Sequence, residues 1–359
     1  MPSPCTFFHR DQPQNPLYAW TSAEHHVLDR AAQSMEPGNV TAAATDFVLL
    51  GLTFQPELRH FLFPLFLAVY LVTLLGNLLI VFLTRWDPAL CRTPMYFLLG
   101  HLSLADVGFT TTAAPKLLGI LASGSGAISY GSCLAQMYFF ITFGVLENFL
   151  LTVMAYDRYV AVCHPLRYAT LISPGRCWGL VGTAWGLAHF HASLHTILMS
   201  RLPFCGSRHI HHFFCDLQQL LALACGDTST NEIAVFAEGG LAVLVPFLFV
   251  AASYGRIVVA ILRLPSAQGR RKAVSTCGAH LVAVAVFYGT VIGIFFRPSS
   301  SYNPQKDMVA SLLYSTITPL LNPFIYTLRN KDLHAAWRRA LGQCRVSGEV
   351  LPMGRETQG

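Results

Sequence analysis

Seven long apolar runs are the feature that most constrains how this chain can fold. The first, Phe61–Thr84, has no charged residue. At about 1.5 Å per helical residue it is long enough to cross a hydrocarbon core roughly 30 Å thick. The others are Pro94–Leu121, Leu134–Tyr156, Cys177–Ser200, Val235–Leu262, Ala279–Phe296 and Met308–Leu328. One such run could be a core helix of a soluble protein, but seven joined by short polar links predict an all-α integral membrane protein, a seven-transmembrane helix bundle.

Composition and charge support this fold class and orient it. Hydrophobic residues make up 53% of the chain and charged residues 12%, whereas a soluble domain carries about 25% charged residues. If the N-terminus lies outside, 16 of the 24 Lys and Arg residues fall in cytoplasmic segments, seven fall outside, and Lys116 lies within the second helix. The positive-inside rule therefore predicts this orientation. The net charge of +6 follows from the asymmetry and does not indicate a nucleic-acid partner.

The chain divides into three predicted parts. Residues 1–60 form an extracellular tail, residues 61–328 the transmembrane domain, and residues 329–359 a cytoplasmic segment. Residues 1–34 lack the apolar core of a cleavable signal peptide, so the first membrane helix is expected to act as a signal-anchor. The tail contains the sequon at Asn39, on the side where N-glycosylation occurs.

The cytoplasmic segment begins with an amphipathic pattern. Leu333, Trp337 and Leu341 recur every four residues, with basic residues on the other face. This spacing predicts a short eighth helix on the inner leaflet, in contact with membrane lipid. The end of the chain from Gln343 is expected to be disordered.

Cysteines mark the outer side of the protein. Cys133 lies at the outer end of the third helix, and Cys205, Cys215 and Cys225 lie in a long outer loop of about Arg201–Ala234. Oxidising conditions favour two disulfides among them, and the residues alone leave three pairings open. The cysteines expected to remain cytosolic thiols are Cys91, Cys163 and Cys344.

A fifteen-residue string, MAYDRYVAVCHPLRY, ends the third helix at Met154–Tyr168. The Asp157–Arg158 pair alone could be ordinary snorkelling at the membrane edge, but the whole string is too specific for that. It resembles the Asp-Arg-Tyr signature of rhodopsin-like G-protein-coupled receptors in its olfactory form. Asp157 neutralises the Arg158 guanidinium, and release of Arg158 would let it meet a G-protein helix in an opened inner cavity.

Other strings resemble the same family. They are PMYFL from Pro94, LSLAD from Leu102, HFFCD from His212, SY at Ser253, KAVSTCGAHL from Lys272, FYGT from Phe287 and PLLNPFIYTLRN from Pro319. Together they extend from about Phe47 to Leu341, so most of the chain resembles an olfactory receptor. Val274 and Gly278 depart mildly, because the family more often has Phe and Ala or Ser there.

The resemblance implies a function and a set of partners. It implies a multi-pass receptor in the plasma membrane of a sensory cilium, which binds small, mostly apolar volatile odorants and activates a stimulatory heterotrimeric G protein that raises cyclic AMP. Trafficking chaperones are further expected partners. The residues implied in coupling and activation are Asp157, Arg158, Tyr159, Tyr254, His280, Asn322, Pro323 and Tyr326.

The resemblance also implies site residues on the outer side. It pairs Cys133 with Cys215 and Cys205 with Cys225. Together with helical phase, it places an odorant pocket between the third, fifth, sixth and seventh helices. The expected lining residues are Met137, Phe140, Ile141, Gly144, Val145, Glu238, Ala242, Tyr288, Val291, Ile292, Phe295, Leu312 and Ser315.

Three acids lie within the predicted membrane spans, where a charge is costly and usually functional. Asp106 and Glu147 could be a protonated, hydrogen-bonded pair that ties helices together. The family resemblance favours an allosteric sodium site instead, with Ser103 and Asn322 nearby and Asn77 in the same polar network. Glu238 could contact a polar odorant, a helix partner or lipid headgroups.

Two histidine groups invite comparison with metal sites. His209, His211 and His212 lie near Cys215, but a disulfide removes that thiolate as a ligand, so ordinary loop histidines are favoured. His191 and His195 share one face of the fourth helix, where a packing role is favoured over ligation. Apart from the allosteric sodium ion, no cofactor is expected.

No enzyme is expected, because the chain has no phosphate-binding loop, zinc-protease motif or serine-nucleophile motif. A non-olfactory chemosensory receptor with the same coupling remains an alternative that tissue expression would separate. A membrane transporter predicts inverted repeats and helices broken at the midplane, and the sequence has neither pattern.

Residues 1–34 lack any likeness to the family, whereas Met35 begins a stretch typical of it. Starting at Met35 also removes Cys5 and leaves an even number of outer cysteines. We expect that deleting residues 1–34 leaves surface expression and odorant response intact or improved, with Asn39 glycosylated in both forms. Surface labelling, a glycosidase shift and a cyclic AMP assay on both forms test this, and a poorly folded or silent short form would contradict it.

Overall fold

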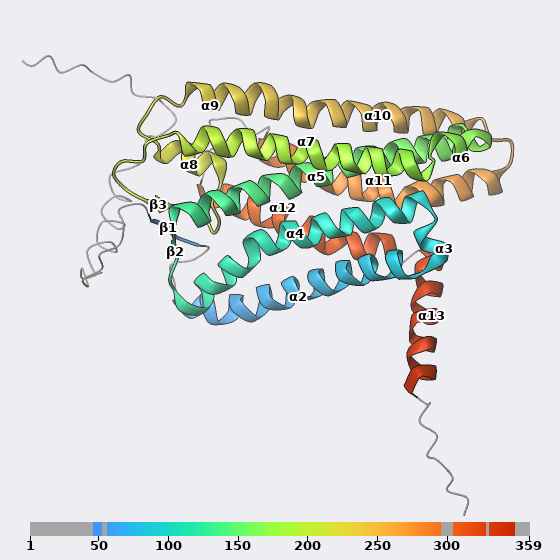
Figure 1. Cartoon of the computed structure of the whole chain (residues 1–359), viewed down its shortest axis with the longest axis horizontal. Helices are drawn as coiled ribbons and strands as arrows, with labels where there is room; N and C mark the ends of the chain where they lie inside the picture. Colours follow the sequence, from blue (N-terminus) through green and yellow to red (C-terminus); the bar gives the residue numbers. More distant parts are fainter. Residues whose placement is uncertain (1–45, 52–55, 296–303, 328–329, 349–359) are drawn as a thin grey trace, which may run out of the picture.

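The structure, a computed structural model, describes residues 46–51, 56–295, 304–327 and 330–348. Met35 and Asn39 lie outside this part. Within it, seven long helices run side by side along the molecule (Figure 1). They are α2 (Pro56–Trp86), α4 (Pro94–Ser123), α5 (Tyr130–Cys163), α7 (Pro174–Ser200), α10 (Gly240–Leu262), α11 (Ala267–Phe295) and α12 (Pro304–Thr327). Helix α5 is central and packs on α4, α7, α10 and α11.

Local sequence sets where several helices begin and end. Ser129 and Ser173 each accept a hydrogen bond from a backbone N–H in the first turn of α5 and α7, which satisfies a donor that the helix leaves free. Gly124 caps the end of helix α4, and its φ of 73° suits glycine. Two residues later, a side chain at Gly126 would collide with the carbonyl oxygen of Leu49.

The outer end of the bundle carries regular structure that the sequence analysis did not anticipate. Strand β1 (Phe47–Leu49) lies between β2 (Ala127–Ile128), to which it is antiparallel, and β3 (His209–Ile210), to which it is parallel. The expected outer loop also contains α8 (Leu217–Leu223) and α9 (Ser229–Ala234). These elements gather at one end of the bundle (Figure 1).

The inner end is more helical than expected. Short helices α3 (Pro88–Cys91) and α6 (Tyr168–Leu171) and the 3₁₀ turn η2 (Pro165–Arg167) form the first two inner loops. Helix α11 begins at Ala267, so most of the inner loop expected between Arg263 and Gly278 is helical. Hydropathy marks only the part of a helix that lies in the membrane, and a helix can extend beyond it into water.

The fifth membrane span starts earlier than expected and contains an irregularity. Helix α9 runs into α10 through the π-turn η3 (Val235–Gly239), so the span begins at Ser229 rather than Val235. In helix α11 the segments Ala267–Ser275 and Cys277–Ile292 meet at 45°. This bend changes the direction of the sixth span part-way along its length.

Length and hydropathy alone do not identify all seven spans. In the described residues four helices qualify, and the bent α11 makes a fifth. Helices α4 and α7 do not qualify, and both carry buried polar side chains: His101, Ser103, Asp106 and Thr110 on α4, and His191 and His195 on α7. These two helices therefore use part of their surface for polar contacts with other helices rather than with lipid.

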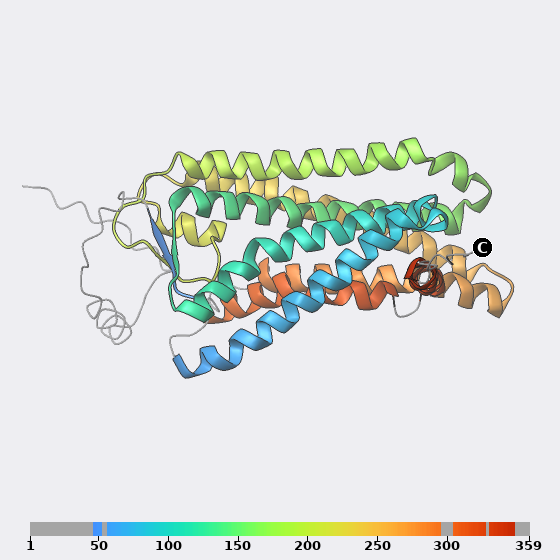
Figure 2. The same cartoon turned by 60° about the horizontal axis from the view of Figure 1, so that its bottom comes forward.

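Helix α13 (Lys331–Gly348) lies crosswise to the bundle at its inner end (Figures 1 and 2). Leu333 is buried against the bundle, whereas Trp337 and Leu341 are 41% and 47% exposed. Their exposed face suits the inner leaflet. The helix extends to Gly348, so the expectation of disorder from Gln343 is wrong for residues 343–348.

An ion pair anchors α13. Arg339 Nη2 lies 2.6 Å from Asp87 Oδ2 in the first inner loop. Burial opposes the charge on Asp87, but hydrogen bonds from Arg339 and from the backbone of Ala89 and Leu90 outweigh it and lower the pKa of this carboxyl. Asp87 therefore stays ionised and holds the amphipathic helix against the bundle.

Candidate functional site

The inner end of α5 holds a buried ion pair. Arg158 Nη2 lies 3.2 Å from Asp157 Oδ2, and both residues are almost fully buried. The hydroxyl of Tyr168 in α6 donates a 2.6 Å hydrogen bond to Asp157 Oδ1. Asp157 thus joins Arg158 to the second inner loop. Tyr159, by contrast, lies nearer the surface, with its hydroxyl 3.1 Å from His164 Nε2.

A second polar link joins three helices next to this pair. The hydroxyl of Tyr254 on α10 lies 2.7 Å from His280 Nδ1 on α11. His280 Nε2 lies 3.0 Å from the carbonyl oxygen of Leu151 on α5. Since a carbonyl oxygen can only accept, Nε2 carries the proton and Nδ1 accepts from the Tyr254 hydroxyl. An outward movement of α11 would break this link.

Helix α12 contributes the remaining residues implied in activation. The Asn322 amide donates to both carboxylate oxygens of Asp106, at 3.2 and 2.9 Å. Pro323 packs at Gly76 of α2, where an added Cβ would lie 3.0 Å from the Pro323 Cβ. Tyr326 is buried, and its hydroxyl has no hydrogen-bond partner among the described residues. That hydroxyl is free to form a new bond after a rearrangement.

The two acids Asp106 and Glu147 meet at the centre of the bundle. Both are buried, Glu147 is the acid next to Asp106, and neither Glu147 carboxylate oxygen has a hydrogen-bond donor in the described structure. The Ser103 hydroxyl is also buried without a partner there. Asn77 belongs to the same region but donates to the Pro319 and Thr73 carbonyl oxygens.

Asn148 is a further polar residue of the bundle that was not predicted from the sequence. Its amide donates a 2.9 Å hydrogen bond to the Ala242 carbonyl oxygen on α10, and its own oxygen accepts a 2.5 Å bond from the Tyr288 hydroxyl on α11. Asn148 therefore ties three helices together below the expected pocket. An amide inside the apolar run Leu134–Tyr156 was the available signal, because such a group must find a partner away from water.

The outer loop covers the bundle. Disulfides Cys133–Cys215 and Cys205–Cys225 have the pairing that the resemblance implies. Phe214 is buried and stacks on Phe140 of α5, with ring centroids 4.2 Å apart. The loop thus reaches into the bundle from Cys215.

His212 has a packing role in this loop. It is buried, and its ring lies 4.7 Å from the ring of Phe213 and 4.3 Å from that of Phe214. Burial lowers its pKa to about 3, so it stays neutral. No metal-ligand group forms from the loop histidines in the described structure.

Comparison with known proteins agrees with this arrangement. The family model described as olfactory receptor matches residues 66–344. The chain belongs to the olfactory receptor family. It is 51% identical to human olfactory receptor 1E1 over 306 residues. The aligned region covers 85% of this chain and 97% of the human protein.

Two rodent relatives give similar figures. Identity is 52% over 299 residues to the rat olfactory receptor-like protein I9, covering 83% of this chain and 95% of the relative. It is 51% over 302 residues to mouse olfactory receptor 1E16, covering 84% and 96%. The protein is therefore a multi-pass membrane protein, a seven-helix G-protein-coupled receptor. Its partners are an odorant ligand and a G protein, and it is not an enzyme.

The expected pocket residues do not all surround one cavity. Leu312 and Ser315 line a cavity of about 20 Å³ between α2, α4 and α12. Glu238 and Ala242 line a groove of about 620 Å³ between α5, α7 and α10. Buried positions elsewhere are Met137, packed near the Cys133–Cys215 disulfide, and Tyr288 and Val291 in the main core.

The remaining residues expected to line the pocket differ in how far they are buried. Ile141 and Val145 are partly buried and pack on these cores, and a Cβ at Gly144 would lie 3.1 Å from the Tyr314 hydroxyl. Ile292 is 45% exposed and lines neither of these two cavities. The side chain of Phe295 lies outside the described residues.

Proposed function

We propose that the receptor binds small, mostly apolar odorants between α5, α10, α11 and α12, on the outer side of Asn148 and Tyr288. Binding shifts a pre-existing equilibrium toward an active state. In that state α11 moves outward and Arg158 and Tyr326 rearrange to receive a stimulatory G protein, which raises cyclic AMP. The plasma membrane of a sensory cilium is the proposed location, with trafficking chaperones as further partners.

The observation that carries the proposal is the closed inner end. Asp157 holds Arg158, and Tyr254, His280 and Leu151 link α10, α11 and α5. Both contacts hold the inner ends of these helices together, and both would have to break before a G protein could enter. A panel of volatile compounds, tested on cells that express the receptor with a cyclic AMP readout, tests the function. The proposal would be contradicted if the receptor reached the surface and none of the compounds raised cyclic AMP, even with a stimulatory G protein co-expressed.

We also propose that Asp106, Glu147, Ser103 and Asn322 form an allosteric sodium site. The residues fit a cation, since two carboxylates meet there and the oxygens of Glu147 and Ser103 have no donors in the described structure. The ion would offset the charge of two adjacent buried acids. It would stabilise the resting packing of α4, α5 and α12.

A sodium dependence follows from this site. Sodium is expected to lower basal and agonist-driven cyclic AMP, and Glu147→Gln is expected to remove that dependence and change basal activity. The measurement is the cyclic AMP response in membranes with sodium exchanged for a bulky organic cation. Glu232→Gln, an acid on the outer segment α9, is the matched control. A wild-type response that ignores sodium would instead support a shared proton between Asp106 and Glu147.

A further inference from the structure

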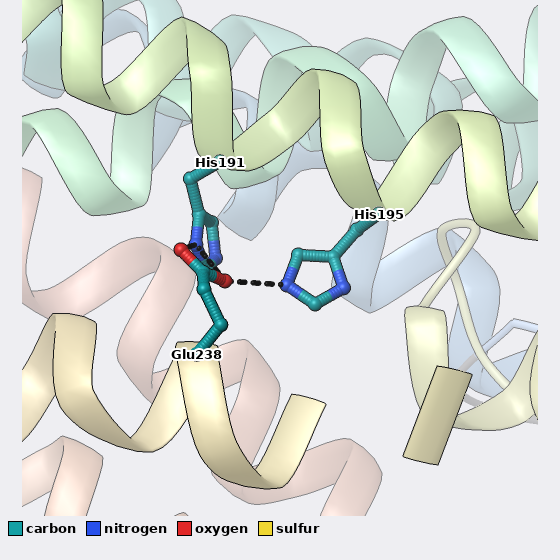
Figure 3. Close-up of side chains that lie close together, drawn as sticks. All are labelled: His191, His195 and Glu238. Atoms are coloured by element: carbon teal, nitrogen blue, oxygen red, sulfur yellow. Dashed lines mark hydrogen bonds and ion pairs between the residues drawn. The ribbon is translucent and has the colours of Figure 1, made fainter. Parts of the chain in front are cut away.

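A cluster of two imidazoles and one carboxylate lies between α7 and the fifth span (Figure 3). His191 Nδ1 lies 2.7 Å from the Glu238 carboxylate, and His195 Nε2 lies 3.1 Å from Glu238 Oε2. The histidines are one helical turn apart on α7, and their ring centroids are 4.6 Å apart. Glu238 faces them from η3. Three side chains from two helices therefore converge on one point.

The local backbone favours this convergence. Glu238 belongs to η3, where a five-residue hydrogen-bonded turn replaces the regular α-helical turn. The wider turn changes the direction in which its side chains point, and such turns occur frequently at functional sites. Figure 3 shows the Glu238 carboxylate directed at both rings.

We propose that His191, His195 and Glu238 bind a divalent transition-metal ion, Zn²⁺, that joins α7 to the fifth span. Two histidines and one glutamate are a known zinc ligand set that leaves one position open. The three ligand atoms lie within 4.8 Å of one another, which no other group of His, Cys, Asp and Glu in the described residues achieves. A tetrahedral zinc ion needs its ligand atoms roughly 3.3 Å apart, from bond lengths of about 2.0–2.1 Å. The largest separation, at most 4.8 Å, would therefore have to shorten by about 1.5 Å.

Zinc binding at this site does not need a strong base to remove protons from the ligands. Each coordinating nitrogen must present its lone pair, so a neutral ring carries its proton on the other nitrogen. A ring that is protonated before binding releases one proton to solvent. The two rings face the carboxylate at hydrogen-bond distance, so a proton can lie between each ring and the carboxylate. Metal and protons therefore compete for the same three atoms.

The cluster lies in the outer half of the bundle, beside a groove. His191 lies nine residues from the outer end of α7 at Ser200, and Glu238 nine residues from the start of the span at Ser229. At about 1.5 Å per residue, both lie roughly 14 Å below that end. Both also line the groove of about 620 Å³ between α5, α7 and α10. The side chain of Glu238 is 34% exposed, whereas that of His195 is 3% exposed. The carboxylate therefore faces the groove, and a fourth ligand would approach the ion from that side.

The test measures zinc binding directly, apart from signalling. Purified full-length receptor in lipid nanodiscs is titrated with Zn²⁺ against a chromophoric zinc indicator, and its melting temperature is recorded with and without Zn²⁺. Wild type is expected to bind zinc and to melt at a higher temperature with it. Glu238→Gln and His195→Asn are expected to weaken binding by at least about tenfold, because each removes a direct ligand.

His189→Asn is the matched control. His189 lies on the same helix, but its Nδ1 lies 2.8 Å from the Tyr138 hydroxyl on α5. This variant should bind zinc as wild type does. Glu238→His should keep binding within about tenfold, since it keeps three ligands of a type that zinc accepts. A purely structural hydrogen-bonded cluster predicts no such retention.

Three results would overturn the site. The first is folded wild-type receptor that does not bind zinc. The second is zinc affinity that is unchanged in Glu238→Gln and His195→Asn. The third is folded Glu238→His receptor that binds no zinc. Elution of each variant as a monodisperse peak on size exclusion separates loss of the site from loss of the fold. None of these readouts depends on an odorant or a G protein, so a failure here leaves the proposed signalling function standing.

Discussion

Arg158→Ala is expected to abolish agonist-driven cyclic AMP at unchanged surface density. Arg158 is the buried cation at the inner end of α5, held 3.2 Å from Asp157. Without its guanidinium, the opened inner cavity offers no charged donor to a G-protein helix. Asp157 keeps its 2.6 Å bond from Tyr168 in this variant, which limits the cost of its unpaired charge. The measurement is cyclic AMP accumulation normalised to surface labelling.

Asp157→Asn should act in the opposite direction. It removes the charge that holds Arg158, so basal cyclic AMP should rise. Arg92→Ala is the control, because Arg92 is an exposed cation on an inner loop, and its loss should leave the response near wild type. If Arg158→Ala folds poorly, Asp157→Asn combined with Arg158→Ala removes the unpaired acid and should still be silent. Normal signalling by either Arg158 variant would refute the role of Arg158.

Removal of the Cys133–Cys215 disulfide should eliminate most receptor from the cell surface. The bond closes a segment of 82 residues and lies buried beneath the outer loop. A chain-entropy model assigns it about 4.5 kcal/mol. This is an upper figure, because helices inserted in the membrane already restrain the unfolded chain. Cys133→Ser also leaves the segment that contains Phe213 and Phe214 without its covalent anchor to α5.

The second disulfide provides an internal comparison. Cys205–Cys225 has a separation of only 20 residues, for which the same model gives about 3.3 kcal/mol. Cys205→Ser should therefore lower surface expression less than Cys133→Ser does. Cys91→Ser, at an exposed free thiol, should have no effect. Surface labelling and thermal stability of the purified variants rank the four proteins, and equal losses for Cys133→Ser and Cys91→Ser would contradict the prediction.

The sequence by itself determined the fold class, the orientation and the family. Each apolar run had the length that a bilayer requires, and a backbone in hydrocarbon must satisfy its own hydrogen bonds as a helix. The asymmetry of Lys and Arg set the orientation. Motifs such as Asp157-Arg158-Tyr159 could be recognised because they are contiguous in the chain.

The tertiary structure decided which side chains meet. Asn148 bonds to Tyr288, 140 residues away, and His191 meets Glu238 across 47 residues. Such contacts depend on the rotation of each helix about its axis and on local irregularities. Glu238 faces α7 from the π-turn η3, and helix α11 is bent by 45° within the sixth span. Hydropathy carries no information about either irregularity, because an apolar helix satisfies the bilayer in any rotation, and only packing against its neighbours selects one.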